Sequence, residues 1–290
     1  MSLTDQVRRT AREIAAAARH VQIDTDRLSE LDPGEPPAPD AERHYLEGPP
    51  EDVAHFLLVL DSVNFGSGWF PTIRKRPGMS GYFTVASSLT DFWRSEGGWS
   101  GAELRSLTPP GLASVLDQDP DHELIGLYTH ALHALGRFLD DRRSIDVIAE
   151  ADGSAERLAA RLAAGMPFYD DVGFWKRAQI VPNDLALAGV AEFDDLDRLT
   201  IFADNLVPHV LRVDGALVYE PALAARIDAG DLLEPGGEER EIRGCAVHAC
   251  ELLSERLGRP ARHIDTALWS RGQRPEYKAV PRHRTRTVFY

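Results

Sequence analysis

Apolar residues recur at the three- and four-residue spacing of helices along most of the chain, and this pattern predicts a mainly helical fold. The first such stretch, Leu3 to Val21, would form an amphipathic helix. Others begin near Asp52 and cover Leu124–Leu139 and Ala155–Ala164. The alternation typical of strands is scarce, and its best case, Ala216–Tyr219, suits a hairpin between helices. We therefore expect an all-α protein with at most a minor β element.

Two further patterns of helical spacing lie in the second half of the chain. Apolar residues repeat from Leu196 to Leu206, just before Pro208, and again from Ile242 to Leu253, shortly before Gly258. Proline and glycine are typical of the region just beyond a helix end. We predict a core helix from each pattern, which would leave Asp204 near the C-terminal end of the first.

The organisation of the chain favours one body over residues 1–290. A proline-rich stretch, residues 32–39, follows the first predicted helix, but the segment before it is too short to form a domain. We expect residues 1–40 to be a helix and a loop packed on the main body. Segment 61–71 combines two glycines with three aromatic residues, which predicts a loop whose backbone closely approaches another segment.

Composition narrows the classes of function. Carboxylates outnumber Lys and Arg by 14, which argues against a protein that follows a nucleic-acid backbone. Cys245 and Cys250 are predicted to be buried thiols rather than a disulfide. No apolar run is long enough for a membrane span, so we expect a cytoplasmic protein. The sequence has no metal-ligand spacing and no phosphate or dinucleotide motif, so neither metal nor cofactor is expected.

Acids and bases inside apolar stretches are the candidate site residues. Asp204 directly follows Phe202 and Ala203, near a predicted helix end where the helix dipole disfavours a negative charge. By position alone, Asp204 would be a turn residue or a cap for a next helix at Pro208. The functional interpretation is a carboxylate held in a pocket.

Other polar residues in such stretches are further candidates. Lys176 and Arg177, in an aromatic segment, could neutralise a phosphate or form surface ion pairs. Asp265 would by default cap a helix, and His44 stands at the exit of the proline-rich loop. The basic tail, residues 283–290, finishes on three apolar residues, which predicts that it docks on the protein.

Several segments, taken in order, resemble the queuosine salvage protein family. The match runs from about His44 to the last residue, and its most specific blocks are Lys-Arg-Ala-Gln at 176–179 and Phe-Ala-Asp at 202–204. The matching segments are Asn64-Phe65 before Trp69, Gly81-Tyr82, 174–180, 199–204, 242–245 and 283–290.

The resemblance implies an all-α relative of the helix-hairpin-helix DNA glycosylases that hydrolyses queuosine 5'-monophosphate to queuine and ribose 5-phosphate. Its partner would be this small molecule, with no stable nucleic-acid complex and no membrane. Asp204 would be the nucleophile or the transition-state stabiliser, and Phe202 a wall against the base. His44 and Asp265 would contact queuine, and Asn64 would also bind substrate.

The sequence departs from the family pattern at two substrate-binding positions. After Asp265 the family commonly has Tyr, and five residues after it another Asp; here these are Thr266 and Ser270. Queuine carries a secondary amine on a cyclopentenediol, so losing an acid would weaken its charge-assisted hydrogen bonding. Asp61 or Asp170 is a candidate replacement. For the 5'-phosphate we expect a helix N-terminus assisted by Lys176.

Cleavage of such a glycosidic bond builds positive charge on the ribose, and a fixed carboxylate lowers that barrier. A 7-deaza base lacks the ring nitrogen whose protonation helps a purine leave, so stabilising the cation must supply more of the rate. Asp204 could form a ribosyl adduct or face the cation while water attacks. Two alternatives are a glycosylase acting on a base in DNA or RNA and a non-catalytic helical protein that binds a nucleobase or a protein.

Overall fold

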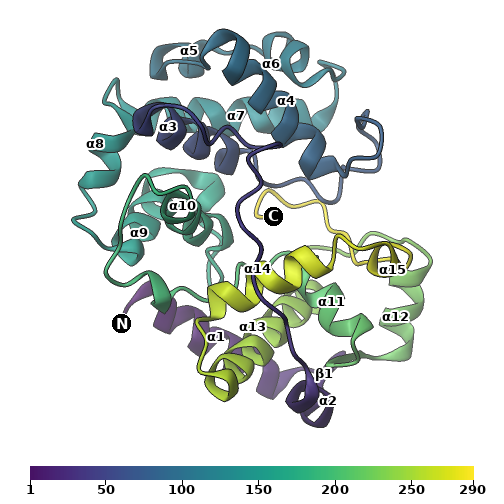
Figure 1. The fold of residues 1–290 in the computed structure, drawn as a ribbon. Coiled ribbons are helices and arrows are strands. Elements are labelled where there is room, and N and C mark those ends of the chain that lie inside the picture. Colours follow the sequence, from purple (N-terminus) through teal and green to yellow (C-terminus); the bar gives the residue numbers. More distant parts are fainter.

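The computed structural model describes residues 1–290 and is mainly helical, as the apolar spacing predicted (Figure 1). The first nine α-helices are α1 (Leu3–Ala17), α2 (Thr25–Glu30), α3 (Pro50–Ser62), α4 (Gly81–Glu96), α5 (Gly101–Ser106), α6 (Pro109–Leu116), α7 (Glu123–Leu139), α8 (Ser144–Ala149) and α9 (Ala155–Gly165). The remaining six are α10 (Lys176–Leu187), α11 (Val207–Val213), α12 (Pro221–Asp228), α13 (Gly237–Leu257), α14 (Ala261–Arg271) and α15 (Pro275–Lys278). Two 3-10 helices, η1 (Pro167–Tyr169) and η2 (Leu196–Arg198), and two strands, β1 (Val21–Ile23) and β2 (Leu217–Tyr219), complete the fold.

The helices form two halves (Figure 1). The upper half holds α3 to α8, the lower half holds α1, α2 and α11 to α15, and α9 and α10 lie at one side between them. The chain crosses from the lower to the upper half in a strap, residues 31–49, that contains no helix or strand. Buried apolar residues from both halves join in one core. No helix has the length and apolar character needed to cross a membrane.

The helices predicted around Asp52, Leu124–Leu139, Ala155–Ala164 and Ile242–Leu253 are confirmed as α3, α7, α9 and α13. Their apolar faces are buried in the core. α13 ends at Gly258, whose φ of 62° is the left-handed conformation that glycine adopts at low cost. Both cysteines are free and buried, as predicted.

The first helix is shorter than predicted. α1 ends at Ala17, and Val21 instead begins β1, which pairs antiparallel with β2 so that Val21 faces Tyr219. The predicted strand at 216–219 is therefore confirmed, but its partner comes from near the start of the chain and not from a local hairpin. Pairing with a distant strand buries Val21 and ends the helical pattern early.

The predicted helix over Leu196–Leu206 is wrong. Only η2, Leu196–Arg198, is helical, and the chain then runs without regular structure to α11, which begins at Val207. Pro208 lies in the first turn of α11, where its missing N–H costs nothing, so it marks a helix start and not a helix end. Asp204 consequently precedes a helix.

The glycine-rich loop does approach another segment closely, as predicted. A Cβ on Gly68 would lie 2.4 Å from the carbonyl oxygen of Thr285 in the tail. The Gly66 N–H donates to the carbonyl oxygen of Tyr290 at 3.0 Å. Thr285 and Tyr290 are buried, so the tail docks on the upper half as its apolar end predicted.

We expect Gly68→Ala to lower the free energy of unfolding by about 1–3 kcal/mol, because the new methyl group must displace the Thr285 backbone. Urea unfolding followed by circular dichroism measures this loss. Gly126→Ala in α7 is the matched control: an added Cβ there meets nothing within 4 Å, so stability should stay level or rise by about 0.5–1 kcal/mol. Equal stabilities of the two variants would contradict a close contact at Gly68.

Candidate active site

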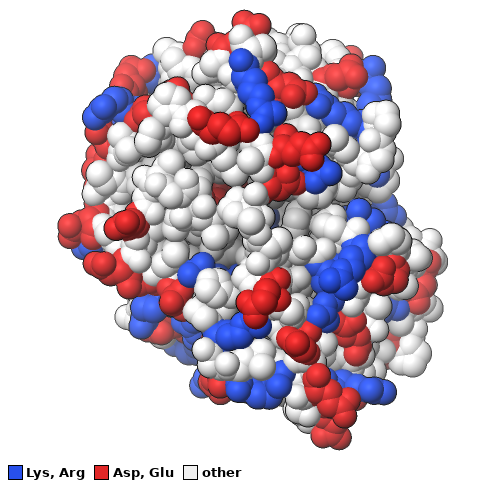
Figure 2. All heavy atoms as spheres, viewed as in Figure 1, with Lys and Arg blue, Asp and Glu red and all other residues white.

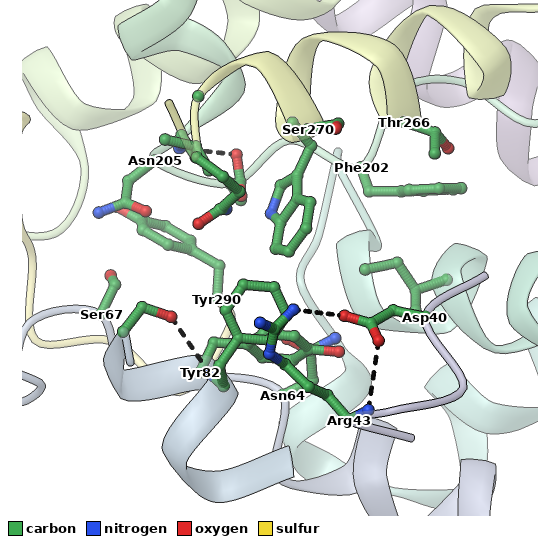
Figure 3. A pocket seen from close by; sticks show the side chains of 18 of the residues that line it. Asp40, Arg43, Asn64, Ser67, Tyr82, Phe202, Asn205, Thr266, Ser270 and Tyr290 are labelled. Carbon is green, nitrogen blue, oxygen red and sulfur yellow. Dashed lines mark hydrogen bonds and ion pairs between the residues drawn. The ribbon is translucent and has the colours of Figure 1, made fainter. Parts of the chain in front are cut away.

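A cavity of about 910 Å³ lies between the two halves (Figure 3). Its lining comes from the strap, the loop before α4, α10, the segment before α11, α14 and the tail. Eight of the candidate residues from the sequence line this one cavity: His44, Asn64, Lys176, Phe202, Asp204, Asp265, Thr266 and Ser270. Arg177, Asp61 and Asp170 do not. Figure 3 shows Phe202 and Thr266 on one side of the cavity, with Tyr82 and Asn64 on the other.

Asp204 lies two residues before Leu206, the N-cap of helix α11, and its side chain binds backbone N–H groups at the start of that helix. Its Oδ1 accepts the backbone N–H groups of Leu206 at 2.8 Å and Val207 at 2.9 Å. The other carboxylate oxygen has no hydrogen-bond partner in the chain, and the side chain is half-buried at the cavity wall. The charge therefore lies at the positive end of a helix dipole, which stabilises it, in contrast to the unfavourable position that the sequence pattern indicated.

Side chains from distant elements hold the irregular segment that carries Asp204. Asp265 Oδ1 accepts the N–H of Phe202 at 2.8 Å. Arg243 of α13 donates from Nε to the carbonyl oxygen of Ala203 at 2.9 Å. These bonds replace the backbone pairing that a helix would have provided, and they fix Asp204 relative to the aromatic side chain of Phe202.

Asp265 lies inside α14 and is no helix cap, which corrects the default interpretation of its position. The side chain is buried at the cavity wall. Burial and, after it, the negative charge of Asp204 raise the pKa of Asp265 well above its usual range. The two carboxyl groups therefore lie close enough on the cavity lining for the charge of Asp204 to disfavour ionisation of Asp265.

Lys176 and Arg177 are buried, so the surface ion pairs considered for them are wrong. Lys176 begins α10, and its Nζ donates to the backbone oxygen of Asn64 at 3.1 Å and to its Oδ1 at 3.3 Å. Burial lowers the pKa of Lys176 to about 8, against the opposing effect of the Asp204 charge. Arg177 instead packs over the rings of Phe65 and Tyr169, at 4.8 and 4.6 Å from their centroids.

Aromatic side chains and His44 form another wall of the cavity. His44 is held by the backbone oxygen of Asp40 on Nδ1, at 2.8 Å, and by the hydroxyl of Tyr82 on Nε2, at 3.0 Å. The Tyr82 ring meets the Trp269 ring edge to face, with centroids 5.7 Å apart. With Phe202, these rings offer flat apolar surfaces of the kind that stack on a base.

The two positions that depart from the family pattern have small side chains. Thr266 lies on the lining but donates its hydroxyl to the backbone oxygen of Arg262 at 3.0 Å, and Ser270 lies on the lining one turn further along α14. Neither residue considered as a replacement for the missing acid lines the cavity. Asp170 is exposed and off the cavity, so it is wrong as a replacement; Asp61 is fully buried behind Asn64 and does not line the cavity either.

The sequence reasoning missed two charged residues of the cavity. Asp184 lies eight residues after Lys176 on α10, at a helical spacing that turns both toward the cavity. Arg282 lies next to the tail segment, and its side chain makes no hydrogen bond or ion pair with the rest of the chain. Helical spacing from Lys176 could have indicated Asp184, but nothing local in the sequence distinguishes Arg282 from its basic neighbours.

Basic side chains gather at one margin of the cavity. Figure 2 shows the molecule hollowed between the halves, with blue side chains beside the hollow on the side where Figure 1 has α15. The basic residues on this side of the lining are Lys278, Arg282 and Arg284. The cavity therefore has an acidic interior and a basic margin. No three acidic, histidine or cysteine side chains come together in an arrangement that could hold a metal ion.

Comparison with known proteins identifies the family of the chain. The family model described as queuosine salvage protein matches residues 44–290. A queuosine 5'-phosphate N-glycosylase/hydrolase of Sphaerobacter thermophilus is 33% identical, over 97% of this chain and 96% of the relative. Proteins of the same name from Nematostella vectensis and Bos taurus are 34% and 28% identical over 81% and 84% of this chain, and over 81% and 83% of their own lengths. The chain therefore belongs to the queuosine salvage protein family.

Proposed function

We propose that this protein hydrolyses the N-glycosidic bond of queuosine 5'-phosphate and releases queuine and ribose 5-phosphate. Family membership and the names of the relatives support this reaction. The observation that carries the proposal for this chain is the fixed carboxylate of Asp204 in a cavity that Phe202 also lines and that is large enough for a nucleotide.

In the proposed mechanism the bond between the anomeric carbon and the base breaks, and its electron pair leaves with the base. The anomeric carbon and ring oxygen then share a positive charge, which the free oxygen of Asp204 faces. Two backbone N–H groups already direct this carboxylate, so little reorganisation is needed when the cation forms. Water supplies a hydroxyl group to the anomeric carbon and a proton to the base. Both direct attack by water and a ribosyl adduct on Asp204 fit this arrangement.

The base is proposed to lie against Phe202, with its guanine-like edge toward Asp265. A carboxyl group can accept the neighbouring N–H groups of such an edge as a bidentate pair. Phe202 and Asp265 are joined by a hydrogen bond of 2.8 Å, so base and sugar contacts are held as one unit with Asp204. His44 and Asn64 complete the wall on the other side.

The decisive experiment incubates the purified protein with queuosine 5'-monophosphate and detects free queuine by mass spectrometry. Parallel incubations with queuosine-containing RNA and with duplex DNA test the glycosylase alternative. Release of queuine from the free nucleotide alone supports the proposal. Release from the polymer alone, or from none of them, would refute it.

We propose that the 5'-phosphate binds at the basic margin, with Arg282 as its main contact. Lys176 was the candidate from the sequence, but its neighbours are Asn64 and carboxylates, whereas Arg282 has no partner and has Lys278 and Arg284 beside it on the lining. Burial lowers the pKa of Arg282, against the opposing charge of Asp204. A phosphate would give this half-buried cation the partner that it lacks.

Arg282→Gln should lower kcat/KM for the nucleotide about 10- to 100-fold and leave kcat/KM for the nucleoside queuosine nearly unchanged, because one charge-assisted contact is lost. Arg226→Gln, which removes an arginine paired with Glu238 outside the cavity, is the control. Steady-state kinetics with both substrates measures the split. If Lys176→Ala shows this selective loss and Arg282→Gln does not, the phosphate contact belongs to Lys176.

A further inference from the structure

One face of α10 lines the cavity over its whole length. The residues on this face are Lys176, Ile180, Asn183, Asp184 and Leu187, and the C-cap residue Ala188 continues it. Asp184 is eight residues beyond Lys176, which corresponds to about 12 Å along the helix axis. The two charged residues on this face, Lys176 and Asp184, therefore lie in different parts of the cavity.

Asp184 differs from the other cavity carboxylates in having no strong partner. Asp204 accepts two backbone N–H groups, Asp265 accepts the N–H of Phe202, and Asp40 forms an ion pair with Arg43 at 2.7 Å. Asp184 accepts only the side-chain amide of its neighbour, at 3.1 Å on Oδ1, and no cation lies within ion-pair distance. Its Oδ2 makes no hydrogen bond and is not sealed off from the cavity.

The surroundings of Asp184 favour a positively charged occupant. Asp61 lies buried nearby, and burial followed by the charge of Asp184 raises the pKa of Asp61. Burial also raises the pKa of Asp184 itself, while the charges of His44 and Lys176 act in the opposite direction. A half-buried carboxylate without a counter-ion is costly. An ammonium group would relieve that cost, and the nearby rings of Tyr82 and Trp269 present faces on which a cation can lie.

We propose that Asp184 is the counter-ion of the secondary ammonium group in the side chain of the substrate, and hence determines specificity for amine-bearing 7-deazaguanines. The proposal rests on the proposed function for the identity of the ligand. The charge of Asp184 acts on Tyr82, whose ring meets that of Trp269, so this carboxylate and the aromatic pair lie in one part of the cavity, which we assign to the base substituent. In this binding mode Asp184 binds and orients the leaving group, while Asp204 acts on the ribose.

The test compares two ligands that differ in the amine. Queuine and 7-deazaguanine share the ring system, and only queuine carries the ammonium side chain. The dissociation constants of both bases are measured by calorimetry for the wild-type protein and for Asp184→Asn, which keeps the shape of the side chain and can still accept the amide of Asn183. We expect Asp184→Asn to weaken queuine binding about 10- to 100-fold and to leave 7-deazaguanine binding unchanged, because one charge-assisted contact is removed.

Turnover provides a second readout. With Asp184→Asn, kcat/KM for queuosine 5'-monophosphate should fall by a similar factor, while kcat/KM for 7-deazaguanosine 5'-monophosphate stays at the wild-type value. Asp170→Asn, an exposed acid outside the cavity, is the matched control and should change neither constant.

Equal losses with both ligands would assign Asp184 a structural role, and an unchanged affinity for queuine would remove it from the binding site; each overturns the proposal. Thermal melting shows whether the asparagine variant is folded. If it is not, Asp184→Glu provides the same comparison, because this variant keeps the negative charge and moves it by one methylene group. Failure of the proposed function looks different, since the wild-type protein would then release no base from either nucleotide, while the binding comparison remains valid.

Discussion

Asp204→Asn should abolish release of the base, with kcat lowered about 1,000-fold or more, and should leave a folded protein that still binds the nucleotide. The loss is large because the negative charge that faces the ribosyl cation is removed at the position where it is needed. Asparagine keeps an oxygen that can accept the N–H groups of Leu206 and Val207, so the cap of α11 survives. Single-turnover release of queuine and nucleotide binding by calorimetry measure the two properties.

A stability control separates the charge of Asp204 from its cap. Asp24 is the N-cap of α2 and also accepts the N–H groups two and three residues ahead, those of Asp26 and Arg27 at 3.1 and 2.9 Å, and it lies outside the cavity. Asp24→Ala and Asp204→Ala should each lose about 1 kcal/mol of stability, because each removes a helix cap. Only the second should lose activity. Near-normal turnover by a folded Asp204→Asn variant would remove Asp204 from the chemistry.

Asp171→Ala should cost about 3–5 kcal/mol of unfolding free energy, because it leaves the buried guanidinium of Arg243 without its main counter-ion. Arg243 and Asp171 are buried with their side chains in direct contact, and Arg243 also lies over the rings of Phe174 and Tyr290. The charge of Asp171 offsets the burial that would lower the pKa of Arg243, and the net effect raises that pKa. The midpoint of urea unfolding, with an unchanged slope, measures the loss.

Two further variants test whether the stability lost by Asp171→Ala comes from the buried charge of Arg243. Asp146→Ala removes an acid from the exposed ion pair with Arg143 and should change stability little, because exposed pairs are screened by water. Asp171→Leu combined with Arg243→Met and Glu239→Gln removes all three charges of this buried cluster and should recover part of the stability lost by Asp171→Ala. If the combined variant is as unstable as the sum of the independent losses, the cluster does not act as a unit.

The long helices could be predicted from sequence because each buries a continuous apolar face. α3, α7, α9 and α13 show the spacing that a core-facing helix requires, and Gly258 ends α13 by a local backbone preference. The segment 199–206 has the same spacing but is not helical, because its apolar residues are buried while its backbone is bonded by Asp265 and Arg243. Those donors and acceptors belong to helices far along the chain, so no window of sequence contains them.

For the candidate site, too, some features could be predicted from the sequence and others could not. The resemblance indicated Asp204, Phe202 and Asp265 as one group, and these residues do share the cavity. Their contacts could not be read from spacing, since the capping role of Asp204 depends on where α11 begins. Asp184 and Arg282 stand out because the folded protein leaves both without an ion-pair partner, and the lack of such a partner is a property of tertiary structure.

The acidic interior and basic margin give the cavity an electric dipole of its own. In the proposed binding mode the intact nucleotide is also a dipole, with an ammonium group at one end and a phosphate at the other, and only one alignment is attractive at both ends. A reversed nucleotide would bring its phosphate against Asp184 and Asp265 and be repelled. Hydrolysis divides this molecular dipole, so that queuine keeps the cation and the sugar keeps the anion. Each product is then attracted at one end of the cavity only, so hydrolysis lowers the electrostatic affinity of the protein for both products.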